Sequence, residues 1–301
     1  MKRIILGAFA IALTATAAHA QLSAYTPQRN QLFATVAYQF QRYDQFWVGD
    51  TEIDLSLATG YDVQYQHSTY LTLEYGILDD LALDVTFGYS WTEFHDGPGP
   101  DLTDDGWTDT TFGVRYRVLD ERDFTCPFVP TLTLRVGGIV AGTYDPEFPF
   151  SSGDGADGIE TSALLAKQLC PGLGLYGEIG YRWRDEDVPD DLFGAAGLAV
   201  TWIERLTLSV GYRHTEGQGG PDIGGPGFGV DYGFPQVKEV DQRIEASLGY
   251  TDGGGRNYAF YFAQTLDGRN TGEKSIFGIS ISIPFGGSEP APAPEYKSYK
   301  Q

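Results

Sequence analysis

The stretch Glu74–Trp91, EYGILDDLALDVTFGYSW, decides the fold, because it predicts two strands joined by a short acidic turn. Apolar side chains occupy the odd positions on both sides of the turn, and mostly small or polar side chains occupy the even positions. A period of two places every apolar side chain on one face of a strand. The apolar face ends in Tyr89 and Trp91, whereas the polar face carries Glu74 and Asp84. This combination is typical of a strand with lipid on one side and a wet lumen on the other.

Residues 1–20 have the pattern of a signal peptide. Lys2 and Arg3 precede a short apolar run, IILGAFAIALTA, and AHA at 18–20 fits an A-x-A cleavage site. The run is too short to prefer spanning a membrane as a helix, and no later stretch approaches roughly 18 uninterrupted apolar residues. We therefore expect an exported chain that begins at Gln21 without a helical anchor. This leaves a soluble secreted protein or an outer-membrane barrel.

The mature chain is strongly acidic. Without Lys2 and Arg3 it carries 18 basic and 41 acidic residues, a net charge of −23. Phosphate binding requires clusters of Lys and Arg, so nucleic acid is excluded as a partner. The 39 glycines, 19 tyrosines and 18 phenylalanines fit many strands, tight turns and aromatic girdles, and a disordered chain would lack these aromatic residues.

Alternation continues along the chain and predicts about twelve strands between residues 21 and 285. Long polar connections, such as 95–106, 143–158 and 216–235, all fall on one side of the predicted sheet, and tight turns fall on the other. Bacterial outer-membrane barrels show this even strand number and loop asymmetry, whereas a soluble sandwich has no reason to sort its loops. The predicted fold class is therefore all-β: one transmembrane up-and-down antiparallel β-barrel in the bacterial outer membrane. Its partners there would be membrane lipid and lipopolysaccharide.

Aromatic residues mark both predicted membrane interfaces. Tyr and Trp are enriched at the two edges of the apolar band of a transmembrane barrel. The predicted girdle residues are Tyr89, Trp91, Trp107, Tyr181, Trp183, Trp202, Tyr212 and Tyr250.

The last predicted strand resembles the aromatic-ended C-terminal signal that the barrel-assembly machinery recognises in its client proteins. The residues of this signal are Gly278, Ile281, Ile283 and Phe285. Residues 286–301, GGSEPAPAPEYKSYKQ, then predict a flexible Pro- and Ala-rich tail in the periplasm. The tail is either a tether to a periplasmic partner or a disordered overhang.

Cys126 and Cys170 are the two cysteines of the chain. Both are predicted at the periplasmic ends of neighbouring strands, and the midpoint between them falls in the intervening loop. An exported chain meets an oxidising compartment, so we predict a structural disulfide between them. Without histidine partners nearby, two cysteines cannot form a structural zinc site.

Charged residues recur on the predicted lumen face. Glu74 and Asp84 are equidistant from Asp79, so they should face each other, and Asp109 should likewise pair with Arg135 across a turn centred on residue 122. Arg115 and Arg117 should lie beside Asp84. The predicted lumen residues are Glu74, Asp84, Asp109, Arg115, Arg117, Arg135, Glu178, Arg182, Arg213, Arg243 and Glu245. They either line a pore and set its selectivity, or brace a narrow barrel and leave no open path.

Catalysis is not indicated. Glu74 and Asp84 suggest a glycosidase pair, but the neighbouring arginines would keep both carboxylates ionised. Ser68 and His67 suggest a lipase, but alternation points them to opposite faces. The acidic loops could bind divalent cations that bridge lipopolysaccharide phosphates, although no spacing matches an EF-hand and a solvated surface explains them more simply. No catalytic residue, resident metal or cofactor is expected.

Two segments carry a family resemblance. Residues 75–83, YGILDDLAL, and residues 106–117, GWTDTTFGVRYR, resemble hairpin motifs of the outer-membrane transporters named after the meta-pathway of phenol degradation. These motifs describe barrel hairpins more than a solute site. The resemblance implies passive uptake of small, aromatic or hydrophobic compounds through the outer membrane, with a small-molecule solute as partner. The alternative is a structural or surface-interaction barrel with a closed lumen.

Overall fold

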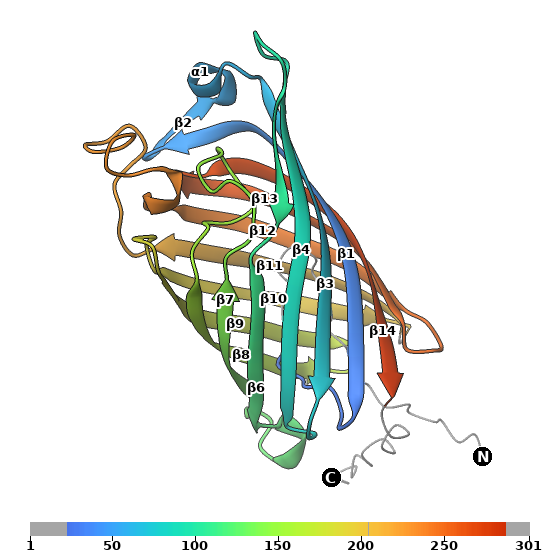
Figure 1. Cartoon of the computed structure of the whole chain (residues 1–301). Coiled ribbons are helices and arrows are strands. Elements are labelled where there is room, and N and C mark those ends of the chain that lie inside the picture. The colour runs from blue at the N-terminus through green and yellow to red at the C-terminus, as the bar shows by residue number, and fades with distance from the viewer. Residues whose placement is uncertain (1–22, 204, 287–301) are drawn as a thin grey trace, which may run out of the picture.

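The computed structural model describes residues 23–203 and 205–286 and is a closed antiparallel β-barrel (Figure 1). Its wall has 12 strands, and β14 pairs with β1 to close the circle. The strands of the wall are β1 (Gln31–Val48), β3 (Val63–Gly76), β4 (Leu81–His95), β6 (Thr110–Leu119), β7 (Thr131–Val140), β8 (Gly158–Cys170), β9 (Leu173–Arg184), β10 (Asp191–Trp202), β11 (Leu206–Gly217), β12 (Val240–Thr251), β13 (Asn257–Arg269) and β14 (Gly272–Gly286). The predicted fold class is confirmed.

Two further strands extend the wall at one end. β2 (Thr51–Asp54) pairs only with β1, and β5 (Leu102–Trp107) pairs only with β4. The short helix α1 (Leu55–Thr59) follows β2, and Figure 1 shows both at the upper end of the barrel. Two 3-10 turns, η1 (Glu121–Asp123) and η2 (Phe234–Gln236), lie in connections.

Alternation of side chains determines which face of each strand meets the lumen. On β3, Gln64, Gln66 and Ser68 are fully buried on the inner face. On the outer face of the wall, Val136 of β7 and Ile179 of β9 are each 58% exposed. Because the outward apolar side chains have no protein cover, they form a lipid-facing band. In the described part of the chain, no helix is long and apolar enough to cross a membrane.

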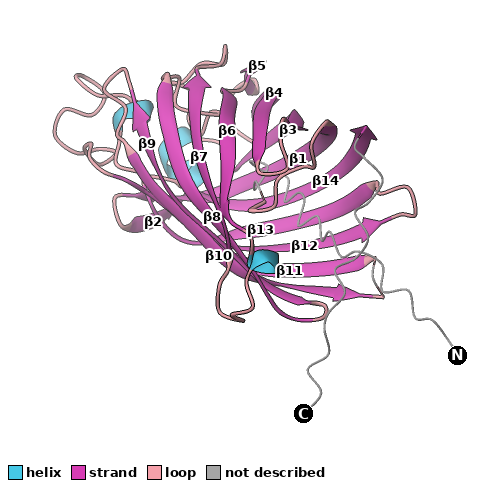
Figure 2. Cartoon of the chain, turned by 90° about the horizontal axis from the view of Figure 1, so that it is seen from below, coloured by secondary structure: helices cyan, strands magenta, loops and turns pink. Residues whose placement is uncertain are grey.

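The connections sort by length as predicted, except that the β6–β7 connection, residues 120–130, is long and lies at the end with the short turns. Residues 49–62, 96–109, 141–157 and 218–239 form the long connections at the upper end in Figure 1. The lower end, towards the viewer in Figure 2, carries the short turns 77–80, 171–172 and 252–256. In an outer-membrane barrel the long loops are extracellular, so we call the two ends extracellular and periplasmic. The proposed signal peptide, residues 1–20, and residues 287–301 of the predicted tail lie outside the described residues.

Candidate functional site in the barrel lumen

The first set of lumen charges forms a continuous chain across seven neighbouring strands. Its members alternate in sign in the order Glu74, Arg115, Asp84, Arg135, Glu160, Arg182 and Asp191. Glu74 and Asp84 face each other across β3 and β4, as predicted, and both contact Arg115, which is fully buried. Arg135 lies 2.8 Å from Asp84 and 2.6 Å from Glu160. Each buried charge therefore has a partner of opposite sign, the condition under which burial is tolerated.

A second chain continues around the opposite wall. It contains Glu178, Arg213, Glu245, Arg243, Asp241, Lys274 and Glu239. Arg213 and Arg243 both donate to the same oxygen of Glu245, at 2.9 and 3.0 Å. Lys274 reaches across from β14 to Asp241 at 3.2 Å. Together the two chains link nearly the whole circumference of the lumen through ion pairs.

Two predicted contacts of this network were wrong. Arg135 pairs in register with Arg115, because the β6–β7 turn spans residues 120–130 and is centred near residue 125, not 122. Asp109 instead lies at the extracellular end, where it contacts Arg184 at 3.2 Å. Arg117 does not reach Asp84 and forms an ion pair with Asp120 at 3.4 Å, close to the periplasmic rim.

Several members of the network were not predicted. They are Glu160, Asp191, Glu239, Asp241 and Lys274. Arg184, which bridges Asp109 and Asp154 outside the two chains, was not predicted either. Asp241 has the same parity as Arg243 and Glu245 on β12, so strict alternation would have identified it. Glu160 lies on β8, whose apolar pattern is less regular, and Glu239 lies in a loop, where period-two arguments do not apply.

The predicted disulfide is not formed. Cys126 and Cys170 are both free and exposed. Cys170 ends β8, but β7 begins only at Thr131, after a segment that includes Pro127 and Pro130. Proline cannot donate to a sheet, so the chain leaves the wall before it reaches Cys126, and the two cysteines are not held on neighbouring strands.

The predicted girdle residues all lie in wall strands or in β5, on the outward parity. Trp107 and Trp202 are the most exposed of them, at 53% and 66%. Tyr89 forms an edge-to-face contact with Trp107, and Tyr181 packs on Trp183 with ring centroids 4.9 Å apart. Tyr212 donates to Gln242, and Tyr250 pairs with Tyr258 of β13. Trp91 stacks on His67 with ring centroids 5.0 Å apart.

The predicted assembly-signal residues close the barrel. Gly278, Ile281, Ile283 and Phe285 pair with Gln39, Val36, Ala34 and Leu32 of β1. The final strand thus has a structural role in the seam, independent of any recognition during assembly.

The segment that precedes β1 lies inside the periplasmic end of the lumen. The Arg115 guanidinium donates to the carbonyl oxygen of Ser23 at 3.1 Å, and Thr133 donates to that of Ala24. Ala24 packs against Leu164 and Ala166, which face inward from β8. The barrel was predicted over residues 21–285, and this inner segment was not foreseen, because alternation of side chains indicates wall strands and carries no signal for a segment inside them.

The extracellular end is narrowed by loops. Arg184 is 3% exposed and bridges Asp109 and Asp154. The Tyr144 hydroxyl donates a hydrogen bond to Asp109 at 2.5 Å. Burial raises the pKa of Tyr144, and the neighbouring Asp109 carboxylate raises it further. These contacts fix the 141–157 loop to the neighbouring strands.

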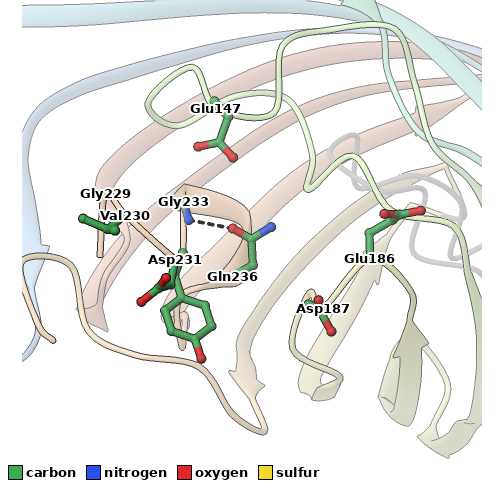
Figure 3. A pocket seen from close by; sticks show the side chains of 9 residues that line it. Glu147, Glu186, Asp187, Gly229, Val230, Asp231, Gly233 and Gln236 are labelled. Atoms are coloured by element: carbon green, nitrogen blue, oxygen red, sulfur yellow. Dashed lines mark hydrogen bonds between the residues drawn. The ribbon is translucent and has the colours of Figure 1, made fainter. Parts of the chain in front are cut away.

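An acidic pocket of about 420 Å³ opens beside this loop (Figure 3). Carboxylates of Glu147, Glu186, Asp187 and Asp231 surround it, and Gln236 accepts a hydrogen bond from the Gly233 amide at 2.7 Å. Among the described residues, no group of three His, Cys, Asp or Glu side chains has metal-binding geometry.

No protein-family model matches the sequence, and no curated protein matches it. The solved structures do contain similar barrels. The COG4313 outer membrane channel from Pseudomonas putida F1 superposes with a TM-score of 0.67 at 14% identity, over 87% of this chain and 98% of that chain. The two chains share one barrel fold. The translocator domain of autotransporter NalP from Neisseria meningitidis has a TM-score of 0.47 at 14% identity, over 83% of this chain and 88% of that chain.

Proposed function

We propose that this chain is a non-enzymatic channel of the bacterial outer membrane for passive uptake of small solutes, with aromatic or hydrophobic compounds as candidates. The observation that carries the proposal is the closed 12-strand barrel with a charged inner face and an apolar outer face. The fold match to an outer membrane channel over 98% of that chain supports it.

The remaining assignments follow from this proposal. Residues 1–20 would direct export, and the final strand would be read by the barrel-assembly machinery. The eight girdle residues would anchor the barrel in lipid and lipopolysaccharide. The charged chains of the lumen would line the solute path. The Pro- and Ala-rich tail would lie in the periplasm.

A closed structural barrel is the second candidate, and specific observations favour it. The residues before β1 fill part of the periplasmic end, and the 141–157 loop lies over the extracellular end. Pairing of the lumen charges also braces the wall. Under this proposal the acidic loops and the tail would contact surface or envelope partners.

Swelling of proteoliposomes separates the two functions. We expect vesicles that contain the folded protein to swell in arabinose and in the aromatic cation tyramine faster than empty vesicles. Slower swelling in the aromatic anion 4-hydroxybenzoate would match the excess of carboxylates in the lumen. Heat-modifiable gel mobility verifies that the barrel is folded. If the vesicles with folded protein then swell no faster than empty vesicles in any of the three solutes, the channel function is contradicted.

A further inference from the structure

The 141–157 loop connects β7 to β8, yet its tip packs against the wall formed by β1, β3 and β4. Phe148 packs on Phe94 of β4, with ring centroids 5.4 Å apart. The Gln64 side chain of β3 donates to the carbonyl oxygen of Pro149 at 3.0 Å. The loop therefore extends inside the extracellular mouth, and Figure 1 shows it below β2 and α1.

Phe150, the next residue of this loop, inserts its ring between two aromatic side chains of β1. It stacks on Tyr43 with centroids 5.5 Å apart and an interplanar angle of 13°, and it meets Phe46 edge-on at 5.4 Å. Tyr43 and Phe46 are only 2% and 3% exposed. Tyr43 faces the lumen, since it lies opposite Gln64 on one side and Lys274 on the other.

The backbone of Phe150 indicates that its ring holds the loop in place. Its φ is 55°, in the left-handed region that disfavours bulky residues. A bulky residue keeps this conformation when its surroundings over-determine it, and such residues cluster at ligand clamps and switches. Here the surroundings are the Tyr43 and Phe46 rings and the Gln64 contact.

We propose that Phe150 is the extracellular gate residue, and that the slot between Tyr43 and Phe46 is a binding site for a planar aromatic ring. Phe150 occupies the slot in the closed state, and an aromatic solute would take its place when the loop moves away. The gate rests on the proposed channel function, whereas ring binding in the slot does not.

The test compares Phe150→Gly with Phe148→Ala in planar bilayers. Glycine removes the ring and suits a positive φ, so the loop keeps a favourable backbone. Phe148→Ala is the matched control, because it removes a ring from the same loop that contacts Phe94 but not Tyr43. We expect higher conductance than wild type for Phe150→Gly and little change for Phe148→Ala. If Phe150→Gly does not fold, Phe150→Ala vacates the same slot.

Ring binding is tested separately by ¹⁹F NMR line broadening of 3-fluorobenzyl alcohol. We expect binding to Phe150→Gly and weaker or no binding to wild type and Phe148→Ala, because an emptied aromatic site can hold a free ring. Competition by benzyl alcohol should exceed that by cyclohexylmethanol about two- to tenfold, the ratio that corresponds to one aromatic pair.

The outcomes separate the gate from the channel. If no variant conducts ions in bilayers but Phe150→Gly binds the ring selectively, the channel function is contradicted and the aromatic binding site is supported. If the wild-type protein conducts and the conductance of Phe150→Gly is no higher, only the gate role of Phe150 is contradicted. Equal competition by the two alcohols, or equal binding to all three proteins, would overturn the aromatic slot.

Discussion

Arg135 is a tightly enclosed residue of the lumen. It is 3% exposed and contacts both Asp84 and Glu160. Two glycines provide its space, because a Cβ at Gly113 or Gly137 would meet the guanidinium at or inside van der Waals contact. The fork geometry of arginine allows one side chain to satisfy two carboxylates on different strands.

Replacement of Arg135 by methionine should lower the free energy of unfolding by about 3 kcal/mol, because Asp84 and Glu160 each lose one of their two arginine partners in a buried network. Urea titration of the barrel in lipid vesicles, followed by tryptophan fluorescence, measures this loss. Arg42→Met is the matched control, because Arg42 forms an exposed outward pair with Asp44 and should cost less than about 1 kcal/mol. Equal losses in the two variants would show that Arg135 is not desolvated.

Asp222 joins three extracellular connections. Arg269 donates to both of its carboxylate oxygens, at 2.8 and 2.6 Å, and Asn270 donates to it at 2.9 Å. Asn270 also accepts hydrogen bonds from the amides of Gly49 and Ile223. The Arg269 and Asn270 hydrogen bonds lower the pKa of Asp222.

Acid should therefore release the 218–239 loop. Because the pKa of Asp222 is lowered on folding, its stabilisation is present above the ordinary aspartate pKa of about 4 and is lost as the pH falls through the lowered value. The partial exposure of the pair keeps the effect small. We expect pepsin to cleave this loop faster in Asp222→Asn than in wild type at about pH 5, with the ratio falling towards one as the pH falls through the lowered pKa of Asp222. A constant ratio would contradict this role.

At the scale of single residues, alternation predicted the inward parity of Glu74, Asp84 and Arg243, because the direction of a strand side chain is a local property. It could not predict which charges meet. Arg135 contacts Glu160 through a register that depends on loop length, and Glu239 joins the network from outside any strand.

At the scale of elements, the β6–β7 connection shows where prediction from sequence ends. A turn centred on residue 122 would have placed Asp109 opposite Arg135. The actual connection contains η1 and two prolines, and it moves the register so that Arg115 takes that place. The length of the turn sets the register of a hairpin, and the length of the turn cannot be read from a polar sequence that is rich in proline.

The segment before β1 is the second such element. Glycine at position 76 permits its course, because a Cβ there would collide with the carbonyl oxygen of Gln28. The segment passes the end of β3 at this point, and its earlier residues lie in the lumen, where Arg115 and Thr133 donate hydrogen bonds to the carbonyl oxygens of Ser23 and Ala24.

Deletion of residues 21–25, which follow the proposed signal peptide, should widen the periplasmic end. We expect a larger single-channel conductance than wild type, because Ala24 no longer fills the space beside Leu164 and Ala166. Thr26→Ala, which removes one hydrogen bond to Asp79 at the rim, is the control and should leave conductance unchanged. An unchanged conductance in the truncated protein would show that the path does not pass this segment.

At the scale of the whole molecule, charge is distributed unevenly. The two lumen chains contain eight carboxylates and six cationic groups. The extracellular loops add further carboxylates, including the four around the acidic pocket. A water-filled path with this excess attracts cations and repels anions.

The reversal potential of the wild-type protein across a planar bilayer with a KCl gradient tests the central claim most directly. If the charged lumen is an ion path, we expect discrete conductance steps and a reversal potential displaced towards that of K⁺. Replacement of Glu160 by glutamine should reduce the displacement. A reversal potential displaced towards that of Cl⁻, or no conductance from a folded barrel, would contradict the assignment of these residues to a pore.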